Sequence, residues 1–190
     1  DRHLFAEFPI CLNIGGIANV SYEMNGRRVA YDICMANQLL NYLANKLGYD
    51  YDKNGQFAKR GNINKMLFEI LNDNEYYKHD APKSLGREFF ENVQHKVIDE
   101  SSLPVYDLLA TATEHIAYQI AKSVDVLDKS KILVTGGGAK NDFLIERICA
   151  LSKHEIIVPD VMITDYKEAL IFAFLGVLKM EGKINVLSSV

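Results

Sequence analysis

The sequence contains no tryptophan and only three cysteines among its 190 residues. Cys11, Cys34 and Cys149 are odd in number and scattered among apolar residues, so we expect reduced, mostly buried thiols of a cytoplasmic protein rather than a disulfide framework. The sequence has no CxxC, HxxxH or HxxE pair, and a zinc site is therefore not expected. The longest apolar run, residues 169–178, is about half of the roughly 20 residues that a membrane span requires, so no membrane partner is expected.

An excess of basic charge is also missing, because 21 basic residues face 25 acidic ones and the net charge is −4. A protein held on nucleic acid by phosphate contacts needs a net basic face, so we expect no nucleic-acid partner. The contents of 48% hydrophobic and 24% charged residues are typical of a globular chain and exclude disorder, collagen and a coiled coil. Asp1 opens the sequence without a signal peptide, and we expect the chain to begin inside a longer protein or after processing.

The first third of the sequence predicts an antiparallel meander. We expect strands at residues 9–14, 17–24 and 28–33. Gly15-Gly16 connects the first two, and Asn25-Gly26, the strongest short hairpin signal, connects the second and third. Apolar residues at helical spacing then predict helices at residues 37–47, 64–71, 87–98 and 104–126.

The last third alternates between strands and helices, which is typical of a parallel sheet with crossover helices. We expect a strand at 131–135, a helix capped by Asn141 or Asp142, a strand at 155–158 and an apolar final helix at 166–180. The final helix is expected to pack in its own core, and the alternative is a contact with a second copy in a homodimer.

These elements predict an α/β fold with a mixed five-stranded sheet and the order βββ-α-β-α-β-α. The helices at about residues 49–103 would be an insertion before the fourth strand. This order is that of one lobe of the actin-like ATPase (ribonuclease H-like) fold.

Two glycine turns carry the chemistry. Gly15-Gly16 lies between two strands, where backbone N–H groups either face an anion or simply close a hairpin. Residues 136–138, three consecutive glycines between a strand and a helix, allow a nucleotide to approach the backbone closely, and a purely structural loop is the alternative. The loop is not a Walker A sequence and fails the Rossmann fingerprint, but Asp160 stands at a suitable distance for a ribose contact, so a dinucleotide site is the second interpretation.

Four segments resemble the anhydro-N-acetylmuramic acid kinase family. Residues 13–21 resemble its NIGGIANVS segment, and residues 135–141 resemble its GGGAxN turn. Residues 83–90 are similar to its K-S-T-G-R-E-x-F segment with Leu85 in place of Thr, and residues 168–175 resemble its EAxxFAxLA helix. The resemblance covers the whole chain in the right order.

The resemblance implies a kinase of cell-wall recycling. Members convert 1,6-anhydro-N-acetylmuramic acid, ATP and water into N-acetylmuramic acid 6-phosphate, with Mg²⁺ held mainly through phosphates and water and no metal site of the protein's own. By analogy, the residues that contact nucleotide are Gly15, Gly16, Asn19, Gly136, Gly137, Gly138 and Asn141. Those on the sugar side are Asp32, Asn37, Arg87 and Glu88. The alternatives are a strand-end cap for Asp32 and exposed charges in a helix's first turn for Arg87 and Glu88.

The sequence also departs from the family. Where members read D-T-G-P-G-N, residues 32–37 keep the aspartate and the asparagine but lose both glycines and the proline. No residue matches the first phosphate loop or the aspartate that activates the attacking water, so the catalytic base is expected in an N-terminal lobe. We therefore expect residues 1–190 to be the C-terminal lobe of a two-lobed sugar kinase. The alternatives are another actin-like sugar kinase or phosphatase, or a non-catalytic nucleotide-binding module.

Overall fold

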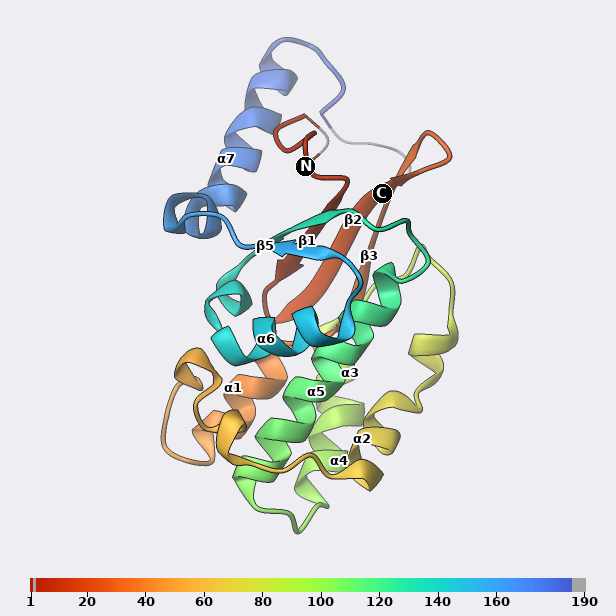
Figure 1. Ribbon diagram of the computed structural model, residues 1–190. Coiled ribbons are helices and arrows are strands. Elements are labelled where there is room, and N and C mark those ends of the chain that lie inside the picture. Colours follow the sequence, from red (N-terminus) through yellow and green to blue (C-terminus); the bar gives the residue numbers. More distant parts are fainter. Residues whose placement is uncertain (2, 186–190) are drawn as a thin grey trace.

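The computed structural model describes residues 1 and 3–185 and is built on a mixed five-stranded sheet of order β3-β2-β1-β4-β5 (Figure 1). The strands are β1 Ile10–Ile14, β2 Ile17–Met24, β3 Arg27–Met35, β4 Lys131–Thr135 and β5 Glu155–Ile157. The first three form the predicted meander, while β4 pairs parallel to both β1 and β5. The predicted mixed sheet and the order of its elements are confirmed.

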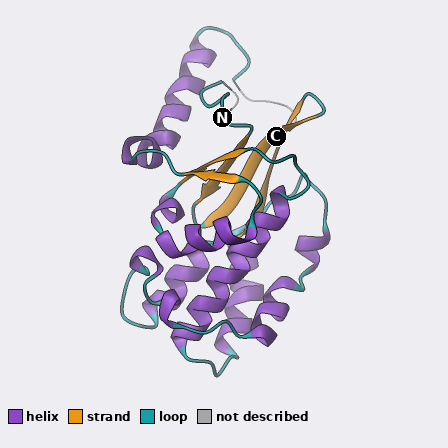
Figure 2. Ribbon diagram, in the orientation of Figure 1, coloured by secondary structure: helices purple, strands orange, loops and turns teal. Residues whose placement is uncertain are grey.

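The helices follow the predicted segments with shifted ends (Figure 2). The longer ones are α1 Asn37–Asn45, α2 Lys65–Asn72, α5 Val105–Val124, α6 Asp142–Leu151 and α7 Val161–Met180. The predicted helix at 87–98 consists of α3 Arg87–Phe89, a π-helical turn at Phe90–Gln94 and α4 His95–Asp99. Short 3₁₀ turns occur at Lys53–Gly55, Ala58–Arg60, Glu75–Lys78 and Gly137–Lys140.

The two faces of the sheet differ, because side chains alternate along each strand. On one face Ile10, Leu12 and Ile14 of β1 join the large core that α1, α5 and α6 complete. On the opposite face Cys11 and Leu133 belong to a small cluster with Phe5 and the N-terminal segment. The helix α7 lies on this second side, beside the N-terminus (Figure 1).

Two expectations about the final helix are wrong. The final helix begins at Val161, five residues before the predicted start, because the Asp160 carboxylate accepts the N–H of Ile163 at 3.0 Å and caps it there. Its apolar side chains are also not all in a core, since Phe172 is 65% exposed and Met180 is 90% exposed.

Cys11 and Cys34 are buried as expected, but Cys149 is exposed on α6. No helix among the described residues is long and apolar enough to cross a bilayer.

The centre of α5 carries a buried histidine in a polar network. The His115 Nδ1–H donates to Oδ1 of Asn72 at 2.8 Å, because a carboxamide oxygen can only accept. The Nε2 atom is therefore the acceptor, and it faces the Tyr77 hydroxyl at 3.2 Å and the Gln94 amide at 3.4 Å. Burial lowers the pKa of His115 from 6.5 to about 3, so this histidine is neutral in the folded chain.

This histidine predicts a loss of stability in mild acid. Its pKa is depressed on folding, so only the unfolded chain takes up the proton once the pH falls below about 6.5. Between pH 7 and pH 5 the free energy of unfolding should fall by about 2 kcal/mol from this group alone. Urea unfolding at both pH values should show that drop in the wild type and a correspondingly smaller one in His115→Gln.

The matched control is His79→Gln, which removes an exposed histidine. It should keep the full pH dependence of the wild type. Equal pH dependence in His115→Gln and in the wild type would contradict the account of the network.

Candidate functional site: two glycine turns at one edge of the sheet

The parallel pairing of β1 and β4 brings the two glycine turns together. Asn13 of β1 pairs with Thr135 of β4, and each strand then runs directly into its glycine turn. A Cβ on Gly138 would lie 2.2 Å from Cγ2 of Ile14, and one on Gly136 would lie 2.7 Å from the Ile14 carbonyl oxygen. Gly136 also has φ of +85°, which L side chains rarely adopt. Only glycine at these two positions allows the turns to touch.

The first turn also fixes the start of α1. The carbonyl of Gly15 accepts the N–H of Asn37 at 3.1 Å, and that of Gly16 accepts the N–H groups of Ala36 and Gln38 at 2.8 and 3.2 Å. The backbone N–H groups at the start of α1, which have no acceptor within the helix, are therefore bound by carbonyls of the first glycine turn. Within the described part of the chain, no acceptor takes the N–H of Gly16 or of Gly137, and both are available to an anion.

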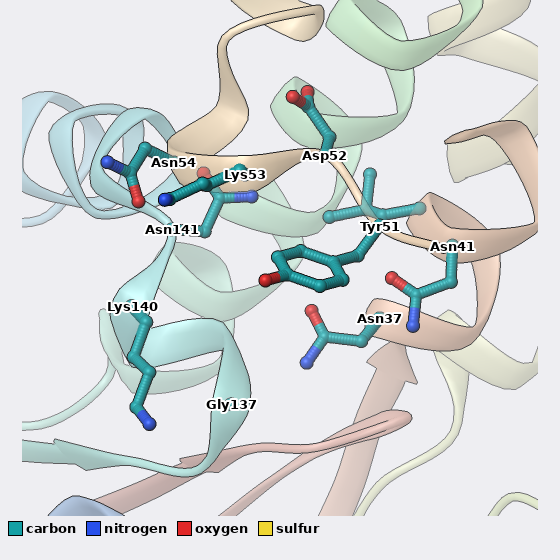
Figure 3. Close-up of a pocket in the computed structure, with 10 residues that line it drawn as sticks. Asn37, Asn41, Tyr51, Asp52, Lys53, Asn54, Gly137, Lys140 and Asn141 are labelled. Atoms are coloured by element: carbon teal, nitrogen blue, oxygen red, sulfur yellow. The ribbon is translucent and has the colours of Figure 1, made fainter. Parts of the chain in front are cut away.

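A cavity of about 430 Å³ opens beside the second turn (Figure 3). Its lining includes Gly137 and Asn141, both predicted to contact nucleotide. Asn37, predicted on the sugar side, also lines this cavity, and its amide would lie 3.6 Å from a Cβ on Gly137. The structure thus places Asn37 with the nucleotide residues and not with Arg87 and Glu88.

The two polar atoms of the Asn141 side chain serve different purposes. Its Oδ1 accepts the N–H of Leu144 at 3.0 Å and caps α6, as one of the two predicted caps. The amide Nδ2 is then the group left to donate to a ligand. The turn at Lys53–Gly55 packs against this residue, because a Cβ on Gly55 would meet Asn141 Oδ1 at 2.5 Å.

Sequence reasoning missed the wall of the cavity that comes from residues 51–54. Tyr51, Lys53 and Asn54 line it, and Tyr51 is 59% exposed, so its ring is available for stacking (Figure 3). Asp52 is instead structural, because its carboxylate accepts the N–H groups of Phe57 and Ala58 at 2.8 and 2.9 Å. The only signal for this wall was the polar, turn-rich composition around Asn54.

A row of polar residues crosses the second face of the sheet just before the glycine turns. Asp32 pairs with Asn19, Asn19 with Asn13, and Asn13 with Thr135. A register shift between β2 and β3 falls next to Asn19, a position at which bulges commonly re-aim side chains beside active sites. The row therefore connects the glycine turns to Asp32 over four adjacent strands. Asn13 and Thr135 were not among the predicted site residues.

Asp32 organises the segment that follows the helical insertion. Its Oδ2 accepts the N–H of Leu85 at 2.9 Å, and its own N–H donates to the Lys83 carbonyl at 3.2 Å. A groove of about 450 Å³ lies here, lined among others by Asn19, Asp32 and Ser84. Asn19, predicted to contact nucleotide, and Asp32, predicted on the sugar side, thus line the same groove.

Arg87 and Glu88 are exposed at the start of α3. Neither lines the cavity beside Gly137 or the groove beside Asp32. The guanidinium of Arg87 pairs with Glu91 at 2.8 Å, as expected for (i, i+4) charges on a helix surface. They follow closely on Leu85, whose N–H binds the Asp32 carboxylate, but both side chains are exposed.

Nearly the whole chain matches a known family. The model of the anhydro-N-acetylmuramic acid kinases matches residues 3–190. Relatives bearing that name are 35% identical over 182 residues in Photobacterium profundum and 34% identical over 182 residues in Vibrio cholerae. The chain belongs to the anhydro-N-acetylmuramic acid kinase family. It spans about half the length of these relatives, because the matches cover 88% and 91% of this chain but 48% and 49% of theirs.

Solved structures identify the fold of this family member as actin-like. The activator of the 2-hydroxyisocaproyl-CoA dehydratase from Clostridium difficile, solved with bound ADPNP, aligns with a TM-score of 0.58 at 18% identity, over 98% of this chain and 67% of that one. Component A of the (R)-2-hydroxyglutaryl-CoA dehydratase from Acidaminococcus fermentans aligns with a TM-score of 0.55 at 18% identity, over 89% and 61%. At this identity the likeness concerns the fold.

The dinucleotide interpretation of the sequence is not supported by the geometry. A Rossmann sheet is mostly parallel, whereas β1, β2 and β3 of this kinase-family chain are antiparallel. Asp160, the expected ribose contact, is used as the cap of α7.

The contact between the turns predicts that alanine substitutions at two neighbouring glycines change the free energy of unfolding by different amounts. Gly138→Ala should lower the free energy of unfolding by about 1–3 kcal/mol, because the new methyl group would overlap Ile14. Gly137→Ala is the matched control, since its Cβ would meet only the Asn37 amide at 3.6 Å; its stability should be unchanged or raised by up to about 1 kcal/mol. Urea denaturation measures both, and equal stability of the two variants would contradict the packing described.

Proposed function

We propose that this chain is the nucleotide-binding part of an ATP-dependent kinase that converts 1,6-anhydro-N-acetylmuramic acid into N-acetylmuramic acid 6-phosphate. The observation that carries the proposal is the juxtaposition of two glycine turns beside a cavity lined by Gly137 and Asn141, in a member of this kinase family. In the proposed arrangement residues 1–190 form the C-terminal lobe, with residues 49–103 as its helical insertion. Cytoplasmic recycling of cell-wall sugar is the proposed setting.

The nucleotide would extend from the cavity to the first turn. Tyr51 offers its ring to a base, and the Asn141 amide offers a donor. The N–H groups of Gly137 and Gly16 offer donors to phosphate oxygens, which need no basic surface when held by backbone amides. Gly15, Gly136 and Gly138 would contribute by keeping Cβ atoms out of the way, as Gly136 and Gly138 do toward Ile14.

The sugar side would begin at the polar row. Asn19 and Asp32 share a groove, and the Asp32 carboxylate can orient a water through the oxygen that does not bind Leu85. In the proposed reaction a water oxygen bonds to the anomeric carbon and gives its proton to the base proposed in the N-terminal lobe. The bond from that carbon to O6 breaks, and O6 bonds to the γ-phosphorus as the bond from phosphorus to ADP breaks. Arg87 and Glu88 would join only from their exposed positions at the start of α3.

Mg²⁺ would neutralise charge on the phosphates in this reaction. Among the described residues there is no group of three or more His, Cys, Asp or Glu side chains that could hold a metal ion. The residue types present fit an ion held mainly by phosphates and water, with Asp32 and Asn19 in the groove, which Asp1 also lines. In this arrangement Mg²⁺ neutralises charge and the residues of this chain position the reacting groups.

Nucleotide binding is tested by calorimetry with Mg²⁺-ATP and, as the competing ligand, NAD. Tyr51→Ala should weaken ATP binding about fivefold to a hundredfold, because base–aromatic stacking is worth about 1–3 kcal/mol. Tyr49→Ala is the matched control: Tyr49 is 56% exposed, packs on Phe57 and does not line the cavity. Binding of NAD in preference to ATP, or equal effects of the two variants, would contradict the proposed pocket.

Turnover is expected to need more than this chain. Phosphoryl transfer depends on positioning across a closed cleft, and one lobe cannot close over its own substrate. The 190-residue chain should therefore show no phosphorylation of the anhydro sugar above background in a coupled ADP assay. Sugar-dependent ADP release by the isolated chain would refute the assignment of residues 1–190 as one lobe.

A further inference from the structure

A second cavity lies at the end of the sheet that is far from the glycine turns. Its volume is about 440 Å³, and it opens between the hairpin of β2 and β3, the C-terminal part of α5 and residues 79–83. We call it the hairpin-end cavity. Tyr22, Val29 and Tyr31 line it from the first face of the sheet, the face of the large core. Among the described residues, none lines both this cavity and the nucleotide cavity.

A buried side chain with an unused acceptor lines the hairpin-end cavity. Gln119 of α5 is only 5% exposed, and its Nε2 donates to Oδ1 of Asn72 at 2.7 Å. The Asn72 Nδ2 donates to the Phe68 carbonyl, so Asn72 Oδ1 accepts and the orientation of the Gln119 amide is determined. No described residue donates to Gln119 Oε1, yet this atom is not sealed in the core. A ligand that donates a hydrogen bond there would remove the cost of leaving a buried acceptor unpaired.

Two lysines without ion pairs line the same cavity. Lys83 donates to the carbonyls of His79 and Tyr76 at 2.8 and 3.1 Å, which leaves one hydrogen of its ammonium group for a ligand. Within the described part of the chain, neither Lys83 nor the exposed Lys122 has a carboxylate within 4.0 Å. Burial lowers the pKa of Lys83, the Asp80 carboxylate raises it, and the charge of Lys122 lowers it again. An anion in the cavity would therefore be attracted by both ammonium groups.

The rest of the wall limits what kind of anion fits. Tyr22 and Tyr31 meet edge to face with ring centres 6.3 Å apart, and the Tyr31 hydroxyl donates to the Ser123 carbonyl at 3.1 Å. An inorganic anion would satisfy the lysines and leave these rings uncovered. An aromatic acid would cover the rings and leave Gln119 Oε1 without a donor. A ring that carries an acid group, apolar C–H faces and N–H or O–H donors satisfies the lysines, the tyrosines and the glutamine together.

We propose that the hairpin-end cavity is a second ligand site that binds a small acidic sugar. The acid group would lie at Lys83 and Lys122, and an N–H or O–H of the sugar would donate to Gln119 Oε1. The proposal goes beyond the proposed function, because the groove assigned to the reacting sugar lies on the other face of the edge strand β3. Tyr31 and Lys83 belong to the boundary between the two spaces and line both.

Lys83 also connects the second site to the first. Its carbonyl accepts the N–H of Asp32 at 3.2 Å, and the next residue, Ser84, lines the groove. A sugar held by the Lys83 ammonium group would therefore contact the segment that borders Asp32.

Calorimetric titration of the 190-residue chain with N-acetylmuramic acid tests the proposal. This sugar has a carboxylate, an acetamide N–H and ring hydroxyls. N-acetylglucosamine has the same ring without the carboxylate, and benzoate has a carboxylate on an apolar ring without donors. We expect each of these two to bind at least about tenfold more weakly than N-acetylmuramic acid, because each leaves one part of the cavity unpaired.

Two variants and the backbone amide signals locate the bound sugar. Lys122→Gln should weaken binding of N-acetylmuramic acid about fivefold to tenfold, because a charge-assisted contact is lost. Lys129→Gln is the matched control, since Lys129 is an exposed lysine that does not line the cavity, and its affinity should equal that of the wild type. In ¹⁵N-labelled chain the amides of Lys122 and Ser123 should shift, while that of Asn19, which lines only the groove, stays in place.

Three results would overturn the proposal. One is binding of N-acetylglucosamine or benzoate as tightly as N-acetylmuramic acid, or no binding of any of them. Another is equal affinity of Lys122→Gln and Lys129→Gln when circular dichroism shows both folded. The third is a shift centred on Asn19 with Ser123 in place, which assigns the sugar to the groove and so supports the proposed function while contradicting the second site. None of these measurements involves ATP, so failure of this site and failure of the proposed function are separable.

Discussion

The approach of the second glycine turn to Ile14 is the contact on which the rest of the site depends. Parallel pairing of β1 and β4 places the two strand ends side by side. The absence of Cβ atoms at Gly136 and Gly138 then lets the second glycine turn pack against the first. The first turn in turn supplies the carbonyls that start α1, and α1 supplies Asn37 to the cavity. One close backbone contact thus positions two turns, a helix end and a cavity wall.

The same pairing explains why the sheet has one structural and one functional face. The face toward α1, α5 and α6 is apolar along β1, β2 and β4, and it holds the large core. The opposite face carries the polar row from Asp32 to Thr135, part of it open in a groove and part beneath α7. Burial on the first face makes the sheet rigid enough for the second to present polar groups at fixed spacing, about 5 Å from strand to strand.

Much of the fold follows from the sequence because local signals agree there. Asn25-Gly26 determines a hairpin, Gly48 with φ of +84° lies in the turn that follows α1, and Asn141 caps α6 as predicted. The wall at Tyr51 was not predictable, because it depends on a turn that tertiary packing places against Asn141. The start of α7 was missed because Val161 and Ile163 are β-branched and resemble the end of a strand more than a helix.

The sequence indicated individual site residues, but it did not indicate which of them share a cavity or a groove. Glycine spacing indicated where backbone could meet a nucleotide, but register decided that Asn37 joins Gly137 while Asp32 joins Asn19. The exposed apolar side of α7 could not be read from hydropathy, because an apolar helix has the same sequence pattern whether its cover is its own core or another body.

The most direct test of the central claim is a titration of ¹⁵N-labelled chain with Mg²⁺-ATP, followed through the glycine amide signals. The account predicts that the amides of Gly16 and Gly137 shift most, while those of Gly26 and Gly182, in exposed turns away from the cavity, stay in place. Shifts centred on Gly26 or Gly182, or no shift of Gly16 and Gly137 when ATP binding is saturated, would contradict the claim that the two turns form one nucleotide site.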